Sequence, residues 1–208
     1  MMISPESYYK RHIKGKDSEG ILKEIKKLKR EINRLKKELE CYEKNFEFFI
    51  DPSPEVRLSC SQLYLQKAIE ALEEIGTKYI PDKREQRGID FNNSVKDIST
   101  IAFTLEGFFY GIHTYTANIT EDEIAFTAED FFEKTELNNI DRKTFLEAIK
   151  DINIGEWKKV YTPKEVIYDG IQWELIIEYR NGKKKLKYVG DNCFPYNFDE
   201  LKKLFKIE

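Results

Sequence analysis

The chain has 208 residues, enough for one domain with a sizeable core or for a small domain with an appendage. Apolar residues make up 40% of the chain and charged residues 35%, so it can bury enough surface to fold, and the high charge fits a long solvated helix. The formal net charge of −3 argues against a protein that binds nucleic acid over its whole surface, and no apolar run is long enough for a transmembrane helix.

Residues 21–49 carry the pattern of a leucine zipper. Apolar residues fill the two seam positions of a seven-residue repeat, with isoleucine at the first and leucine at the second over its best part. The first position holds Ile25, Ile32, Leu39 and Phe46, and the second holds Ile21, Leu28, Leu35, Tyr42 and Phe49. We expect a long helix whose start is capped by Asp17 or Ser18.

A second amphipathic helix is expected directly after residues 51–54, because the prolines there stop the first one. Ser53 is a good N-cap with Pro54 at the first helical position, and Gly76 suits the C-terminal end. Two such helices with a short connection form an antiparallel hairpin, so the zipper seam finds its partner within the chain. A homodimer through the same helices is the alternative.

The predicted first domain, residues 1–80, is therefore a coiled-coil-like helical hairpin arm with a basic start. Residues 1–44 contain 13 Lys and Arg against 8 Asp and Glu. The glutamates interleave with the cations and favour pairing within the helix, so contact with another protein is the main interpretation and nucleic acid the weaker one. The candidate partner-binding cations are Lys26, Lys27, Arg30, Arg34 and Lys37. The stretch before the helix, with His12, is expected to be polar and mobile.

Residues 81–97 are predicted to be a linker with a short helix, and residues 98–208 an α+β sheet domain. Ile101, Phe103 and Leu105 alternate with Ala102, Thr104 and Glu106, which predicts a half-buried strand. Residues 112–120 and 123–128 continue as strands, so an antiparallel meander is expected.

Residues 107–111, where two glycines flank Phe108, Phe109 and Tyr110, admit two interpretations. The glycines favour a β-bulge that turns the aromatic rings onto the core. Alternatively, the rings are displayed to another protein, which makes Phe108, Phe109 and Tyr110 candidate partner-binding residues as well.

The last third gives the clearest pattern. A helix capped near Asp141 precedes a strand with Trp173, Leu175 and Ile177 on one face and Gln172, Glu174 and Glu178 on the other. Residues 180–183 contain an Asn-Gly pair that favours a tight hairpin with both turn residues at positive φ. Asn197 is expected to cap the final helix in a capping box with Glu200. The expected fold class is α+β, with four or five antiparallel strands and helices packed on one face.

Signatures of catalysis are missing from the sequence. It contains no phosphate-binding glycine loop, no cysteine pair at zinc spacing and no nucleophile elbow. The histidines are His12 and His113, and a lone histidine in a predicted strand is more often structural than catalytic. We therefore expect no catalytic residue, no cofactor and no metal site. An enzyme of unrecognised type would need a pocket where carboxylates and His113 converge.

A cytoplasmic location is expected. The first residues lack the apolar stretch and the small-residue cleavage site of a secretory signal. Cys41, Cys60 and Cys193 are an odd number without metal-ligand spacing, which suits free thiols in a reducing compartment.

Four stretches carry a resemblance that runs nearly end to end: residues 8–37, 79–94, 98–116 and 168–205. In the last, a strand with a tryptophan, a hairpin and a G-x-N motif precede the proline before the final helix. On these residues the chain resembles a family of small, uncharacterised cytoplasmic proteins of anaerobic Firmicutes and their mobile elements. The resemblance implies two modules and a bacterial setting, and it implies no activity and no site.

The leading hypothesis is a non-enzymatic protein-interaction protein. The arm would engage a partner, and the sheet domain would anchor it or add a second contact surface. In a mobile element, such a protein could bind and block a host defence effector such as a CRISPR nuclease. A nucleic-acid-associated accessory factor that uses the basic helix is the alternative, with an enzyme of unrecognised type as the second.

Overall fold

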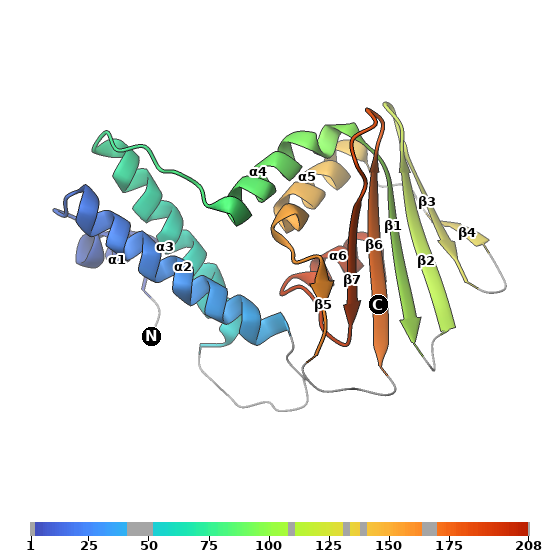
Figure 1. Cartoon of the computed structure of the whole chain (residues 1–208), viewed down its shortest axis with the longest axis horizontal. Coiled ribbons are helices and arrows are strands. Elements are labelled where there is room, and N and C mark those ends of the chain that lie inside the picture. Colours follow the sequence, from blue (N-terminus) through green and yellow to red (C-terminus); the bar gives the residue numbers. More distant parts are fainter. Residues whose placement is uncertain are drawn as a thin grey trace. The chain divides into compact units, whose positions relative to one another are not determined.

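The chain divides into two compact units, Met1–Pro81 and Asp82–Glu208. The computed structural model describes residues 3–40, 52–107, 111–130, 134–137, 141–163 and 170–207. Helices α1 to α3 form the first unit, and a sheet with helices α4 to α6 forms the second (Figure 1). The α+β class and the mainly antiparallel sheet predicted from the sequence are confirmed.

In the first unit, α2 (Ser18–Glu40) and α3 (Pro54–Glu74) lie side by side and run in opposite directions (Figure 1). The zipper seam is buried from Ile21 to Leu35, and its residues Ile21, Ile25 and Leu28 pack in the core of this unit. The predicted caps are confirmed, since the Asp17 carboxylate accepts the N–H of Gly20 and the Ser53 hydroxyl accepts the N–H of Val56. The later seam positions Tyr42, Phe46 and Phe49 lie outside the described residues.

The N-terminal stretch is helical, so the prediction of a mobile start is wrong. Helix α1 (Pro5–His12) packs on α3, and its Tyr8 ring stacks on that of Tyr64 with centroids 4.1 Å apart. The Tyr8 hydroxyl donates a hydrogen bond of 2.5 Å to the buried carboxylate of Glu24. The first unit is thus a three-helix assembly, because one buried tyrosine anchors an otherwise polar helix.

The sheet of the second unit has seven strands in the order β4-β3-β2-β1-β6-β7-β5, more than the four or five expected. The strands are β1 (Ile98–Gly107), β2 (Gly111–Ile119), β3 (Ile124–Glu129), β4 (Lys134–Leu137), β5 (Val160–Tyr161), β6 (Ile171–Tyr179) and β7 (Leu186–Asp191). Every pairing is antiparallel except that of β5 with β7. The short edge strands β4 and β5 carry too few residues to show an alternating pattern in the sequence.

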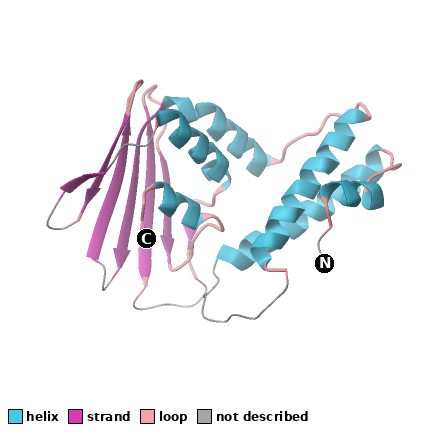
Figure 2. Ribbon diagram, turned by 180° about the vertical axis from the view of Figure 1, so that it is seen from behind, coloured by secondary structure: helices cyan, strands magenta, loops and turns pink. Residues whose placement is uncertain are grey.

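Helices cover one face of the sheet (Figure 2). They are α4 (Lys83–Ser94), α5 (Arg142–Ile152) and α6 (Phe198–Leu204), with the 3-10 turns η1 (Val95–Asp97) and η2 (Ile154–Glu156). Phe91 and Val95 are buried in the core with Phe103, Leu175 and Ile177 of the sheet. Residues 82–97 therefore belong to the second unit, where a linker was expected, because Phe91 and Val95 give this polar helix two buried anchors.

The connection between β6 and β7 is longer than the tight turn predicted from its Asn-Gly pair. Residues 180–185 separate the two strands, and Ile177 pairs with Leu186. Gly182 has a φ of 72°, but Asn181 keeps a negative φ and its side chain accepts the N–H of Lys183. Only Gly182, one of the two turn residues, has a left-handed backbone conformation, so the type of turn predicted does not form.

The strands β6 and β7 meet closely at Trp173 and Gly190, which are register partners. The Trp173 indole N–H donates a hydrogen bond of 2.9 Å to the Cys193 carbonyl across Gly190. A Cβ at Gly190 would lie 2.0 Å from the indole nitrogen and 2.6 Å from that carbonyl oxygen. Only glycine leaves room for the indole here, so the core position of Trp173, as predicted, depends on Gly190.

The thiols differ from the sequence-based expectation. Cys60 is a free thiol and Cys193 is disulfide-bonded, while Cys41 lies outside the described residues. Three free thiols were the argument for a reducing compartment, and that argument is lost.

The Glu24 carboxylate predicts a pH dependence of the first unit. Burial would raise its pKa, but the hydrogen bond from Tyr8 and the charges of Lys27 and Lys16 outweigh this effect and lower it below 4.5. A lowered folded-state pKa stabilises the fold above the unfolded-state pKa, and the contribution is lost as the pH falls through the folded-state value. We expect Glu24→Gln to be less stable than wild type at pH 7 and the difference to shrink below about pH 4. Urea unfolding with amide exchange read over α1 to α3 measures this, and a constant difference would contradict it.

A methyl group at Gly190 tests the close approach of β6 and β7. We expect Gly190→Ala to lower the free energy of unfolding by about 2–4 kcal/mol, because the indole must move and give up its hydrogen bond. Thermal unfolding followed by tryptophan fluorescence measures the loss. Gly20→Ala is the control, since its Cβ would meet only the exposed Asp17 and Lys16 side chains, both at 3.1 Å, and alanine favours the helix. Equal unfolding temperatures of the two variants would rule out the steric argument.

Candidate functional site

The strand register divides the side chains of the sheet between two faces. Ile101 and Phe103 of β1 are buried beneath the helices, so Thr104 and Glu106 point to the other side, which we call the open face. On β1, β2, β3, β6 and β7 its polar residues are Thr100, Thr104, Glu106, Thr114, Thr116, Asn118, Thr127, Glu129, Gln172, Glu174, Glu178, Lys187 and Asp191.

Acidic side chains outweigh basic ones on the open face. Its carboxylates are Glu106, Glu129, Glu174, Glu178 and Asp191. Lys187 is the lysine of the set, and it forms an ion pair with Glu174 on the neighbouring strand. Glu106 is exposed and has no ion pair or side-chain hydrogen bond within the described part of the chain. The face therefore carries net negative charge.

Half-buried threonine hydroxyls occupy the middle of the open face. Thr104 and Thr114 are register partners on β1 and β2, and their hydroxyl oxygens lie 3.1 Å apart. A hydroxyl can donate and accept, so this row can adapt to the polar groups of a bound molecule.

A groove of about 350 Å³ crosses the open face at its β5 side. Its lining residues come from β1, β5, β6 and β7 and from the residue after β5: Thr104, Glu106, Val160, Tyr161, Thr162, Gln172, Trp173, Glu174, Val189, Gly190 and Asp191. The groove combines the carboxylates of three strands with the apolar side chains of Val160 and Val189. Carboxylates beside apolar side chains suit an alkyl chain with a cationic group, as in lysine or arginine.

One end of the groove is fixed by Asn192, which has a φ of 49°. Its side chain donates a hydrogen bond of 2.7 Å to Asp191 and accepts the N–H of Ile171 at 2.9 Å. A Cβ at Gly170 would overlap the Asn192 side chain, so Gly170 and Asn192 fit together only because the first is glycine. Gly170 and Asn192 thus meet where β6 begins and β7 ends, and this contact orients the Asp191 carboxylate.

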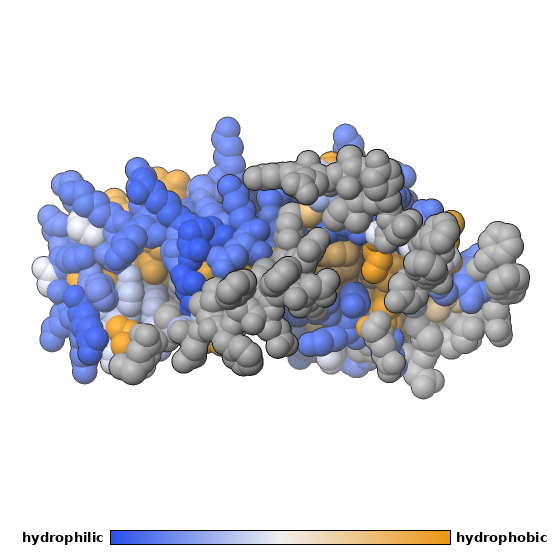
Figure 3. Space-filling view, turned by 90° about the horizontal axis from the view of Figure 1, so that it is seen from below, coloured by the Kyte–Doolittle hydropathy of each residue, from blue (hydrophilic) through white to orange (hydrophobic). Residues whose placement is uncertain are grey.

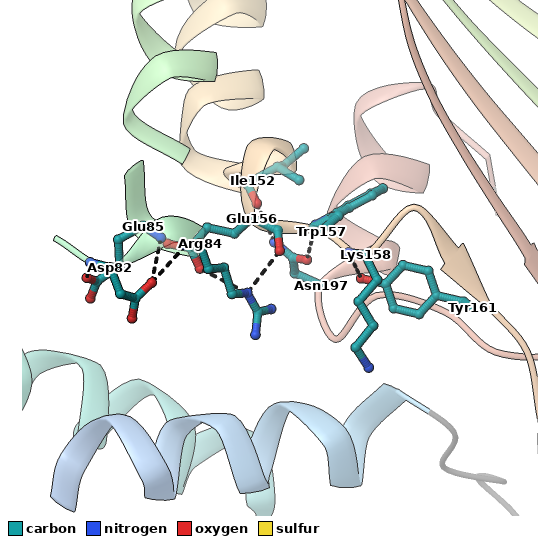
Figure 4. A network of polar contacts seen from close by, with 9 residues as sticks. All are labelled: Asp82, Arg84, Glu85, Ile152, Glu156, Trp157, Lys158, Tyr161 and Asn197. Atoms are coloured by element: carbon teal, nitrogen blue, oxygen red, sulfur yellow. Dashed lines mark hydrogen bonds and ion pairs between the residues drawn. The ribbon is translucent and has the colours of Figure 1, made fainter. Parts of the chain in front are cut away.

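A polar network holds the segment that leads into β5 (Figure 4). The Trp157 indole N–H donates to the Asn197 side chain at 3.1 Å, and the Asn197 amide donates to the Ile152 carbonyl at 2.7 Å. Asn197 is buried and makes no side-chain cap of α6, so the predicted capping box does not form. A buried amide is stable only with its partners, and here it joins α6, α5 and the approach to β5.

A second part of the network fixes α4 against η2 (Figure 4). Asp82 and Glu85 form a capping box at the start of α4, and the Arg84 guanidinium donates to the Glu156 carbonyl at 2.9 Å. Further along, the Lys158 N–H donates to the Tyr161 hydroxyl at 3.1 Å. These bonds set the position of β5 and with it one wall of the groove.

His113 lies on the opposite face of the sheet from the groove carboxylates, since it pairs with Leu105 and alternates with Thr114. The pocket of carboxylates around His113 that an enzyme was expected to need is therefore not formed by the described residues. Within the same residues no cluster of His, Cys, Asp and Glu could hold a metal ion.

The five predicted partner-binding cations lie on α2 of the first unit, and all are exposed. Arg34 bonds to Glu31 and to Glu38 at 2.8 Å. The hydrogen bond from Arg34, and after it the one from Arg57, hold the pKa of Glu31 below its ordinary value. Lys27 lies 3.4 Å from Glu24.

Lys26, Arg30 and Lys37 follow one line of the helix and form no ion pair within the described residues. The side of the helical unit seen in Figure 3 is largely hydrophilic. The other predicted partner-binding residues, Phe108, Phe109 and Tyr110, lie outside the described residues, so neither interpretation of them is tested.

The groove carboxylates Glu106, Glu174 and Asp191 are absent from the candidate residues predicted from the sequence. The signal was present for β6, where Glu174 and Glu178 alternate with buried residues. What the sequence could not show is that β1 and β7 lie on either side of β6, because those pairings join segments far apart in the chain.

None of the described helices has the length and apolarity needed to cross a membrane. Comparisons of the chain with family models, with curated proteins and with solved structures find no match.

Proposed function

We propose that the protein is a non-enzymatic binding protein whose open face takes a positively charged surface of another protein. The observation that carries this proposal is the segregation of charge on the sheet: among the polar open-face residues of β1, β2, β3, β6 and β7 there are five carboxylates and one lysine, Lys187, which is paired with Glu174. Lysine and arginine side chains entering the groove would meet Glu106 and Asp191 at one end and Val160 and Val189 along its wall.

The composition of the open face favours recognition by charge over recognition by hydrophobic burial. Its polar residues are mainly threonines and carboxylates that reach solvent, and its exposed apolar side chains Ile112 and Val160 lie on strands separated by β1, β6 and β7, so no large continuous apolar surface is available to a partner. Complementary charge mainly accelerates association and rejects partners of the wrong sign. The protein would therefore bind a basic partner quickly, and binding would weaken as salt rises.

The resemblance to proteins of mobile elements suggests the kind of partner. Proteins that handle nucleic acid expose lysines and arginines to bind phosphates, and a CRISPR nuclease holds its heteroduplex in a positively charged channel. An acidic sheet face would compete with nucleic acid for such a surface. We propose a host defence effector such as a CRISPR nuclease as the partner, met in the bacterial cytoplasm.

The helical arm would supply a second contact. Lys26, Arg30 and Lys37 form an exposed basic line, and this line also supports the second candidate function, contact of the arm with nucleic acid. Leu28 and Leu35 are core residues of the first unit, so aspartate at these positions would unfold the arm instead of testing its surface. Lys26→Glu and Arg30→Glu change the surface alone.

Neutralising two carboxylates of the open face tests the proposal. Glu106 and Glu178 are exposed, so Glu106→Gln/Glu178→Gln should fold normally. We expect the wild-type protein to bind a purified, guide-loaded CRISPR nuclease of an anaerobic Firmicute and to inhibit cleavage of its target DNA. The variant should associate about tenfold more slowly and with a weaker salt dependence. Biolayer interferometry at several salt concentrations gives the association rates.

The matched control is Asp90→Asn/Asp151→Asn, which removes the same charge from exposed positions on α4 and α5. The control should associate as wild type does. If the association rates of both double variants fall by the same factor, net charge alone governs binding and the open face is not the site. If neither the wild type nor a variant binds the nuclease, this partner is wrong.

A further inference from the structure

Four cations from three segments gather beside β7, on the side away from the open face. Arg87 comes from α4, Lys159 directly precedes β5, and Lys183 and Lys184 lie in the connection between β6 and β7. We call these four residues the basic patch. All four are exposed, and all belong to the second unit.

Aromatic rings, and not carboxylates, hold two of the three lysines of the basic patch. The Lys159 ammonium lies 3.9 Å from the centroid of the Tyr188 ring, and that of Lys183 lies 4.8 Å from the Tyr179 ring. Both tyrosines are buried, with 2% and 7% of their surface exposed, so the rings are fixed platforms. A cation–π contact orients an ammonium group while its positive charge stays available.

Like charges crowd the centre of the patch. The pKa of Lys159 is lowered, first by burial of its side chain and then by the charges of Arg87 and Lys184. No carboxylate offsets these effects at Lys159. An anion placed among the three cations would relieve their repulsion, which is the electrostatic condition for an anion site.

Within the described residues the cations of the patch form no ion pairs, whereas several other cations of the same unit do. Lys150 pairs with Glu147, Lys187 with Glu174 and Lys202 with Asp199. Arg87, Lys159, Lys183 and Lys184 have no ion pair with any carboxylate in the described part of the chain. A solvated lysine face normally interleaves with glutamates, as α2 does, and the patch does not.

We infer that the basic patch is a binding site for phosphate groups, separate from the open face. The Arg87 guanidinium can take two phosphate oxygens, and Lys159 and Lys184 add two ammonium groups from two other segments. Tyr188 holds Lys159 in place before a ligand arrives, so less side-chain entropy is lost on binding. The phosphates could belong to a nucleic-acid backbone or to a small polyphosphate, and these sources share one chemistry.

The test uses the full chain with two probes, a fluorescein-labelled single-stranded DNA of twelve nucleotides and unlabelled tripolyphosphate. We expect anisotropy to show binding of the DNA at low salt, and Lys159→Gln/Lys184→Gln to weaken it at least fivefold. The slope of log affinity against log salt should fall by roughly 1.4, because two phosphate contacts are lost. Lys143→Gln/Lys203→Gln removes the same charge from exposed positions on α5 and α6 and should bind as wild type does.

The second probe identifies the source of the phosphate. Displacement of the DNA by tripolyphosphate supports the patch as a site for isolated phosphate groups, and DNA binding that resists it supports a nucleic-acid backbone. Circular dichroism confirms that each variant is folded. If wild type binds neither probe, or if the patch and control variants bind equally, the inference is overturned.

Discussion

The antiparallel pairing of β1 with β6 is the constraint on which the second unit depends. It joins segments some seventy residues apart and lies at the centre of the sheet, with three strands beyond β1 and two beyond β6. On one side the pair buries Phe103, Leu175 and Ile177 under the helices, and on the other it presents Thr104 and Glu174. A shift by one residue would exchange the two faces, so the buried side fixes the register and thereby places the groove carboxylates.

Glycines and asparagine side chains then determine how the elements next to the β1–β6 pair are packed. Gly190 lets the Trp173 indole reach its carbonyl partner, and Gly170 makes room for Asn192. Asn197 ties three elements together from a position that resembles an ordinary helix cap. Each contact helps to set one wall or one end of the groove, because each lies next to β5, β6 or β7. The chemistry of the open face thus rests on packing that occurs on the other face.

The elements that could be predicted from the sequence are those long enough to show a repeating pattern of apolar residues. The seven-residue repeat placed Ile21 to Leu35 in a seam and the alternation on β6 placed Trp173 inside, because a buried stripe repeats at the period of its element. Helix α1, β4 and β5 were missed because they are too short to repeat. Asn197 and Asn181 were misassigned because their side chains prefer another partner in the folded chain. The groove carboxylates and the basic patch could not be assembled from the sequence, since each joins three or more separate segments.

A net charge of −3 conceals two surfaces of opposite sign within one unit. The carboxylates of the open face alternate along β6 and β7 with buried residues, and the cations of the basic patch rest on Tyr188 and Tyr179 beneath the same strands. A β-strand sends successive side chains to opposite sides, so Val189 beside the groove and Tyr188 under Lys159 are neighbours that serve different surfaces. Local potentials, and not the total charge, steer charged partners. The two proposed sites would together hold a basic protein surface on one side of the sheet and phosphate groups on the other, the two components of a protein bound to nucleic acid.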